Sequence, residues 1–160
     1  ADGGWTATAP RVFVQDARLG DYSRPAQVET MVHELVHFAS APLSGPFIPA
    51  WVHEGVADWV ATGRPAGERR PAGGDALLPR DYEMSTGSSV AIVRAYRESR
   101  AAVSLLAGRR GADAPPAFFA GLGDVRTGPG SVDHNVDAAL RATEGLSLGE
   151  LEAAWASRRP

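Results

Sequence analysis

Apolar residues recur at helical spacing along most of the chain. In the first such segment, about residues 25 to 39, the apolar positions are Val28, Met31, Val32, Leu35, Val36 and Ala39. This spacing predicts an amphipathic helix, with Ser23 or Asp21 as its cap and Pro25 in its first turn. A second helix is predicted over about residues 50 to 62, after Pro49 and before Gly63.

The C-terminal half has the same helical periodicity. It predicts helices over about residues 88 to 107, 133 to 143 and 148 to 157, with a short apolar piece at "PPAFFAGL" between the first two. The last helix has the clearest start, because Ser147 and Glu150 form a capping box. Leu146 and Leu151 flank that box at staple positions.

Two stretches depart from the helical pattern. Apolar and β-branched residues alternate around Val12 to Val14, which predicts one or two short strands before residue 16. Residues 64–87 are rich in Gly, Pro and Arg and predict a loop or lid. The pattern as a whole predicts one mainly helical α+β domain over residues 1–160, in which residues 1–63 carry the strands and first helices and 88–160 form a helical C-terminal part.

Composition narrows the possible functions. Of the 160 residues, 44% are apolar and 22% are charged, as expected of one globular domain with a core. A formal net charge of −3 provides no basic surface for nucleic acid or for an anionic membrane, and no stretch has the length of a membrane span. Because cysteine is absent, any metal has to bind to His, Asp or Glu.

The first predicted helix contains the sequence "HELVH". Residues four apart on a helix lie about 40° apart around its axis, so His33 and His37 project from one face. Glu34 falls within the same arc. Two imidazoles can therefore hold one ion while the carboxylate reaches a water bound to it, and this spacing predicts a metal site.

A catalytic zinc ion usually has three protein ligands, so a third ligand is needed. A histidine six residues after His37 would be typical of metzincins, but that position is Leu43. The next predicted helix instead offers Glu54 as a ligand. Asp58, one turn later, is placed to accept the spare N–H of a ligand histidine.

These residues resemble a known family. HExxH followed by W-x-x-E-G-x-A-[DE]-[WY] is similar to the gluzincin metallopeptidases, in particular to their compact peptidase-MA-like branch. Ala95-Tyr96 and the stretch "ALRATEGLSLGELEAAW" extend the resemblance over about residues 28–157. It implies a zincin-like fold with a minimal N-terminal sheet, a zinc ion bound by His33, His37 and Glu54, Glu34 as general base, and Asp58 supporting a ligand histidine.

The oxyanion that develops during such a hydrolysis needs a further hydrogen-bond donor. Tyr96 is the first candidate, because related proteins also carry a Tyr on the helix after the lid. His134, in the first turn of a predicted helix behind a Gly-rich loop, is the second. Tyr82 and His53 are the remaining candidates.

The expected activity is zinc-dependent hydrolysis of peptide bonds in a peptide or protein substrate. Two alternatives stay open, namely a zinc hydrolase of some other amide and a non-catalytic binding module. The chain begins without an initiator Met, and together with the habits of the family this favours an exported protein. Oligomeric state and cleavage specificity are left open by the sequence.

Overall fold

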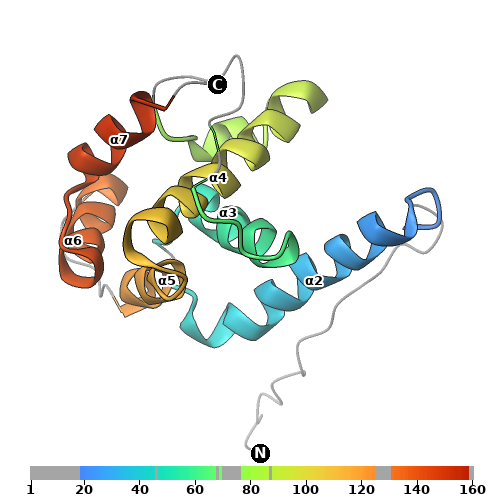
Figure 1. Ribbon diagram of the computed structural model, residues 1–160, viewed down its shortest axis with the longest axis horizontal. Helices are drawn as coiled ribbons and strands as arrows, with labels where there is room; N and C mark the ends of the chain where they lie inside the picture. The colour runs from blue at the N-terminus through green and yellow to red at the C-terminus, as the bar shows by residue number, and fades with distance from the viewer. Residues whose placement is uncertain are drawn as a thin grey trace, which may run out of the picture.

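The structure is a computed structural model that describes residues 19–45, 47–67, 69, 77–86, 88–124 and 131–158. Its α-helices are α2 (Arg24–Ser40), α3 (Ala50–Ala61), α4 (Ser89–Arg110), α5 (Ala114–Asp124), α6 (Val132–Glu144) and α7 (Leu148–Ala156). Two short 3-10 helices, η1 (Ala41–Leu43) and η2 (Asp81–Met84), complete the set. In Figure 1, α4 passes through the middle of the molecule beside α3, with α2 on one side and α6 and α7 on the other.

The prediction of an α+β fold is wrong, because every regular element in the described part of the chain is helical and no strand is found there. The zincin-like fold with a minimal sheet is not observed either. The physical reason is that the apolar faces of the helices pack against one another, so helix–helix contacts form the core of the described residues without a sheet. The strands expected before residue 16 lie outside the described residues.

The helices themselves begin and end close to the predicted boundaries. The capping box of α7 is confirmed, since the Ser147 N–H donates to Glu150 Oε2 over 2.7 Å and the Glu150 N–H donates to Ser147 Oγ over 3.1 Å. Ser23 is the N-cap of α2, although its side chain makes no capping hydrogen bond. The apolar piece "PPAFFAGL" belongs to a helix of its own, α5.

The core lies around α4 and α3. Its largest fully buried side chains include Trp59, Trp155 and Phe118. The indole N–H of Trp59 donates to the carbonyl oxygen of Pro65 over 2.7 Å, and that of Trp155 donates to Leu77 over 3.0 Å. These bonds attach the predicted loop or lid to the core at two described residues, Pro65 near its start and Leu77 near its middle.

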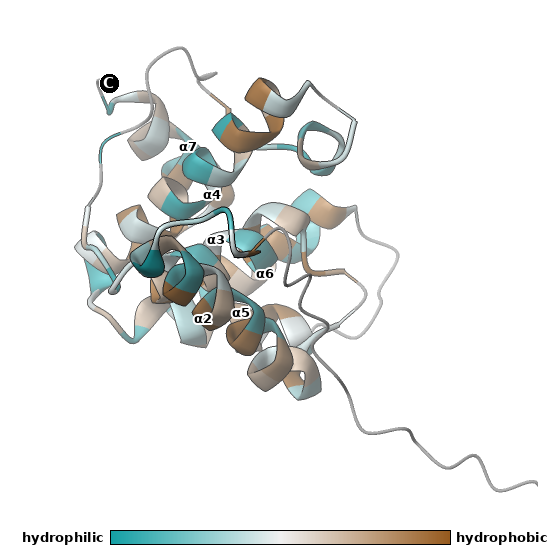
Figure 2. Ribbon diagram, turned by 90° about the vertical axis from the view of Figure 1, so that its right-hand side faces the viewer, coloured by the Kyte–Doolittle hydropathy of each residue, from teal (hydrophilic) through white to brown (hydrophobic). Residues whose placement is uncertain are grey.

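Helix α2 is packed differently from the others. None of its residues is buried, and Val28, Leu35 and Phe38 on its apolar face are 51%, 52% and 44% exposed. Figure 2, in which α2 extends toward the viewer, shows both hydrophilic and hydrophobic positions on it. Its opposite, polar face contacts α3, so the contact that positions α2 is the one that carries the histidines. Among the described helices, none is both long and apolar enough to cross a membrane.

Gly55 lets α3 and α4 approach closely. A Cβ atom built on Gly55 would lie 2.6 Å from the carbonyl oxygen of Ser99 and 2.9 Å from Val103 Cγ2 on α4. Only hydrogen at this position allows the two backbones to touch. This contact fixes the side of α3 next to Glu54 and therefore the position of the metal centre described below.

We predict that Gly55→Ala destabilises the protein by about 2 kcal/mol, because the added methyl group forces two backbones apart. Gly149→Ala on α7 is the matched control, since nothing lies within 4 Å of its Cβ position, and it is expected to be neutral or to stabilise by about 0.5 kcal/mol. Urea denaturation of both variants measures the difference. Equal unfolding midpoints for the two variants would show that the α3–α4 contact is not tight at Gly55.

Candidate metal centre

Three side chains from two helices converge on one point. The Nε2 atoms of His33 and His37 lie 3.0 Å apart, and Glu54 Oε2 lies 3.1 Å from the first and 3.4 Å from the second. Ligand atoms about 2.05 Å from a tetrahedral zinc ion would be about 3.3 Å from one another. The triangle that α2 and α3 form thus has the size that a tetrahedral metal site requires, and the three residues form a group able to hold a metal ion.

Hydrogen bonding at His33 supports this interpretation. Its Nδ1 lies 2.7 Å from Asp58 Oδ1, and because a carboxylate only accepts, Nδ1 carries the hydrogen. In the neutral ring, Nε2 then presents a lone pair toward the carboxylate of Glu54, which is also only an acceptor. Two facing lone pairs repel each other unless a cation lies between them, so the donor set fits a proton or a metal ion.

The pKa values of His33 and Glu54 are shifted in the directions that favour positive charge between them. Burial would lower the pKa of His33, but its hydrogen bonds to Asp58 and Glu54 outweigh burial and raise the pKa to about 9. For Glu54, burial would raise the pKa, but hydrogen bonds from His33 and His37 lower it to about 2. Without a metal, the proton on His33 balances the carboxylates. A metal has to displace that proton, so its apparent affinity rises with pH up to about pH 9.

An open groove of about 990 Å³ lies against this centre. It is bounded by α2, the C-terminal half of α3 and the N-terminal half of α4, and His33, Glu34 and Asp58 all line it. Glu34 is exposed and follows a ligand histidine directly. The carboxylate of Glu34 therefore borders the space in which a molecule next to the metal would lie.

Tyr96 also lines the groove, from α4. Its ring centroid lies 6.4 Å from that of His33. Burial, followed by the charges of Glu54 and Asp58, raises the pKa of Tyr96 to about 12. The side chain therefore stays a phenol at neutral pH and can donate a hydrogen bond.

The other three candidate donors lie outside the groove, although His53 is close to a histidine of the candidate centre. The His53 ring lies 6.2 Å from His37 and packs edge-on against Phe119 at 5.1 Å. Tyr82 on η2 is 65% exposed. His134 is exposed in the first turn of α6, where its backbone N–H donates to Ser131 Oγ. None of the three is among the residues that line the groove.

Two basic residues that the sequence pattern did not indicate, Arg97 and Arg100, also line the groove. Both follow Tyr96 on α4, and Arg100 lies one helical turn beyond it. That i, i+4 spacing is the signal that would have placed Arg100 beside Tyr96. The described residues of the segment 64–87 do not line the groove.

In comparisons with protein-family models, curated proteins and solved structures, nothing matches this chain. The resemblance to gluzincin peptidases thus rests on the quoted residues alone. It stays a prediction.

We predict that Asp58→Asn weakens zinc binding by about 10- to 100-fold, because the amide no longer holds the Nδ1 hydrogen of His33 as a carboxylate does. Titration against a zinc chelator, with circular dichroism to check folding, measures the effect. Asp124→Asn, which removes a charge at the exposed end of α5, is expected to leave the affinity unchanged. An equal affinity in both variants would remove Asp58 from the metal centre.

Proposed function

We propose that this protein is a zinc-dependent hydrolase of peptide bonds. The proposal rests above all on one observation, the convergence of His33 Nε2, His37 Nε2 and Glu54 Oε2 within 3.4 Å of one another. Two imidazoles and one carboxylate are a ligand set typical of catalytic zinc and leave a fourth position for water or substrate. The ligand set and the adjacent groove support this function whatever the overall fold.

The groove supports a substrate of extended shape. It is open to solvent along α2 and α4, and both apolar and polar side chains line it, among them Ile92, Val93 and Thr30. A peptide presents both kinds of group to such a surface. The carbonyl that reacts would lie at the end of the groove bordered by His33, Glu34 and Tyr96.

A zinc ion bound to these residues would supply Lewis acidity, which makes water nucleophilic near neutral pH and polarises a carbonyl oxygen. The carboxylate of Glu34 takes the proton of the attacking water and passes it to the leaving nitrogen. The hydroxyl of Tyr96 donates a hydrogen bond to the carbonyl oxygen as negative charge develops there. Asp58 keeps the hydrogen of His33 on Nδ1 and so keeps Nε2 free to bind the metal.

We predict that Glu34→Gln lowers kcat by about 10²- to 10⁴-fold while zinc content stays the same, because the amide cannot take a proton. Elemental analysis and turnover of casein or of a peptide library measure the two quantities on the same preparation. Undiminished turnover by this variant would contradict the role of Glu34. If no peptide is cleaved but another amide is, and Glu34 is still required, the zinc hydrolase of a non-polypeptide amide replaces the peptidase.

A binding module without activity is the remaining alternative. Such a module has no physical need for a carboxylate beside the ligand histidines. Failure of the zinc-loaded wild type to hydrolyse any amide would favour this alternative over both hydrolases.

We predict that Tyr96→Phe lowers kcat by about 10²-fold with little change in KM, because a donor that acts on developing charge contributes mainly in the transition state. His134→Ala is the comparison variant. If His134 supplied the donor instead, the loss of kcat would appear in that variant and not in Tyr96→Phe. Steady-state kinetics of both zinc-loaded variants distinguish the two residues.

A further inference from the structure

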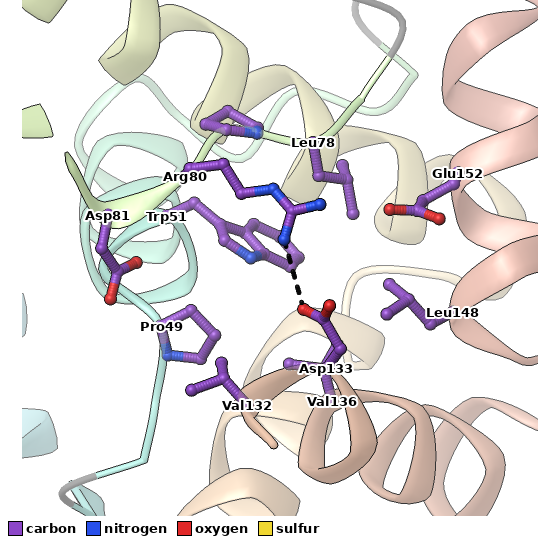
Figure 3. Close-up of a pocket in the computed structure, with 11 residues that line it drawn as sticks. Pro49, Trp51, Leu78, Arg80, Asp81, Val132, Asp133, Val136, Leu148 and Glu152 are labelled. Atoms are coloured by element: carbon purple, nitrogen blue, oxygen red, sulfur yellow. Dashed lines mark ion pairs between the residues drawn. The ribbon is translucent and has the colours of Figure 1, made fainter. Parts of the chain in front are cut away.

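A second, smaller pocket lies away from the metal groove. Its volume is about 190 Å³, and the start of α3, the segment 78–81, α6 and α7 enclose it. Figure 3 shows its walls, in which apolar side chains predominate: Pro49, Trp51, Leu78, Pro79, Val132, Val136 and Leu148. No residue lines both this pocket and the metal groove.

More acidic than basic side chains line the pocket. Arg80 is its single cation and lies 3.5 Å from Asp133. The carboxylate of Asp81 instead accepts a hydrogen bond from the backbone N–H of Ala50, at the start of α3, over 2.9 Å. Glu152 is the third carboxylate, and among the described residues it has no hydrogen-bond or ion-pair partner. Three carboxylates against one guanidinium leave the pocket with an excess of negative charge.

Figure 3 shows how these groups lie. The guanidinium of Arg80 points toward Asp133, and the carboxylate of Glu152 points from α7 into the pocket, on the side of Arg80 and Leu78. A positive group beside Glu152 would meet a carboxylate that has no partner among the described residues, whereas Asp133 is already paired with Arg80. An anion beside Glu152 would be repelled by that carboxylate.

Trp51 adds an uncharged hydrogen-bond donor to the pocket. The ring is only 5% exposed, and within the described chain no acceptor takes its indole N–H. The fully buried rings of Trp59 and Trp155 each donate to a backbone carbonyl instead. The N–H of Trp51 can therefore donate to a water or to a bound molecule.

We propose that this pocket binds a small organic cation, an ammonium group carried on one apolar body about the size of a benzene ring. An apolar cavity of about 150 Å³ holds benzene, so a volume of about 190 Å³ suits such a body beside Trp51 and Leu148. Glu152 receives the ammonium group. The proposal is independent of the proposed metal chemistry.

The test uses 2-phenylethylamine as the probe and 2-phenylethanol as its neutral counterpart, with binding followed by the amide signals of ¹⁵N-labelled protein. Shifts at Val136 and Leu148 report this pocket, whereas shifts at Glu34 and Thr62 report the metal groove. We expect the amine to bind about fivefold more tightly than the alcohol, the range expected of one partly exposed ion pair. The preference should shrink as sodium chloride is raised from 50 to 500 mM.

Glu152→Gln should reduce the preference for the amine to less than about twofold, since it removes the carboxylate and keeps the shape. Asp113→Asn, which removes an exposed carboxylate that does not line the pocket, should keep it. Equal binding of amine and alcohol to the wild type would overturn the proposal. So would amine shifts confined to the metal groove, or a preference that survives both Glu152→Gln and high salt.

A competition experiment identifies the kind of molecule that carries the cation. A capped Gly-Lys-Gly tripeptide that displaces 2-phenylethylamine would identify the natural ligand as a basic side chain of a peptide. Displacement by 2-phenylethylamine analogues alone would identify it as a free amine.

Discussion

The placement of α2 against the rest of the described structure depends on three ligand atoms that meet between α2 and α3. His33 and His37 on one helix and Glu54 on the next point their ligand atoms at a common centre, with 3.0 to 3.4 Å between them. Such a cluster is stable only when positive charge balances it. A proton on His33 provides that charge without metal, as the raised pKa of His33 shows, and a divalent cation would provide more of it.

The way α2 packs makes this junction important for stability as well. A helix of 17 residues is only marginally stable by itself in water, and α2 buries none of its residues in the described chain. Its polar face, with the two histidines, is the face that contacts α3. A cation bound to both helices would therefore act as a cross-link between α2 and the core, and binding energy would appear as folding energy.

Contacts with the remaining helices fix the position of α3, which carries Glu54 and Asp58. Gly55 allows α3 to touch the backbone of α4, and the fully buried rings of Trp59 and Trp155 hydrogen-bond to the backbone of Pro65 and Leu77. The result is a rigid side of α3, which presents Glu54 and Asp58 to α2, and a separate pocket at its start, which contains Trp51. One helix thus contributes to two sites of different chemistry: a cluster of metal ligands and an apolar pocket with excess negative charge.

The sequence alone predicted the helices and the three residues of the candidate metal centre. Helical periodicity and the capping box at Ser147 are local properties, and the i, i+4 spacing of His33 and His37 places both on one face whatever surrounds the helix. Tertiary structure decided what no local pattern contains. In the described chain the core forms between helices alone, and Tyr96 lies near His33 while His134 does not line the groove. The tertiary structure also brings Glu152, Trp51 and Arg80 together in one pocket. These are contacts between residues far apart in the chain, and they follow from how the apolar faces of several helices pack together, which the pattern of a single segment does not specify.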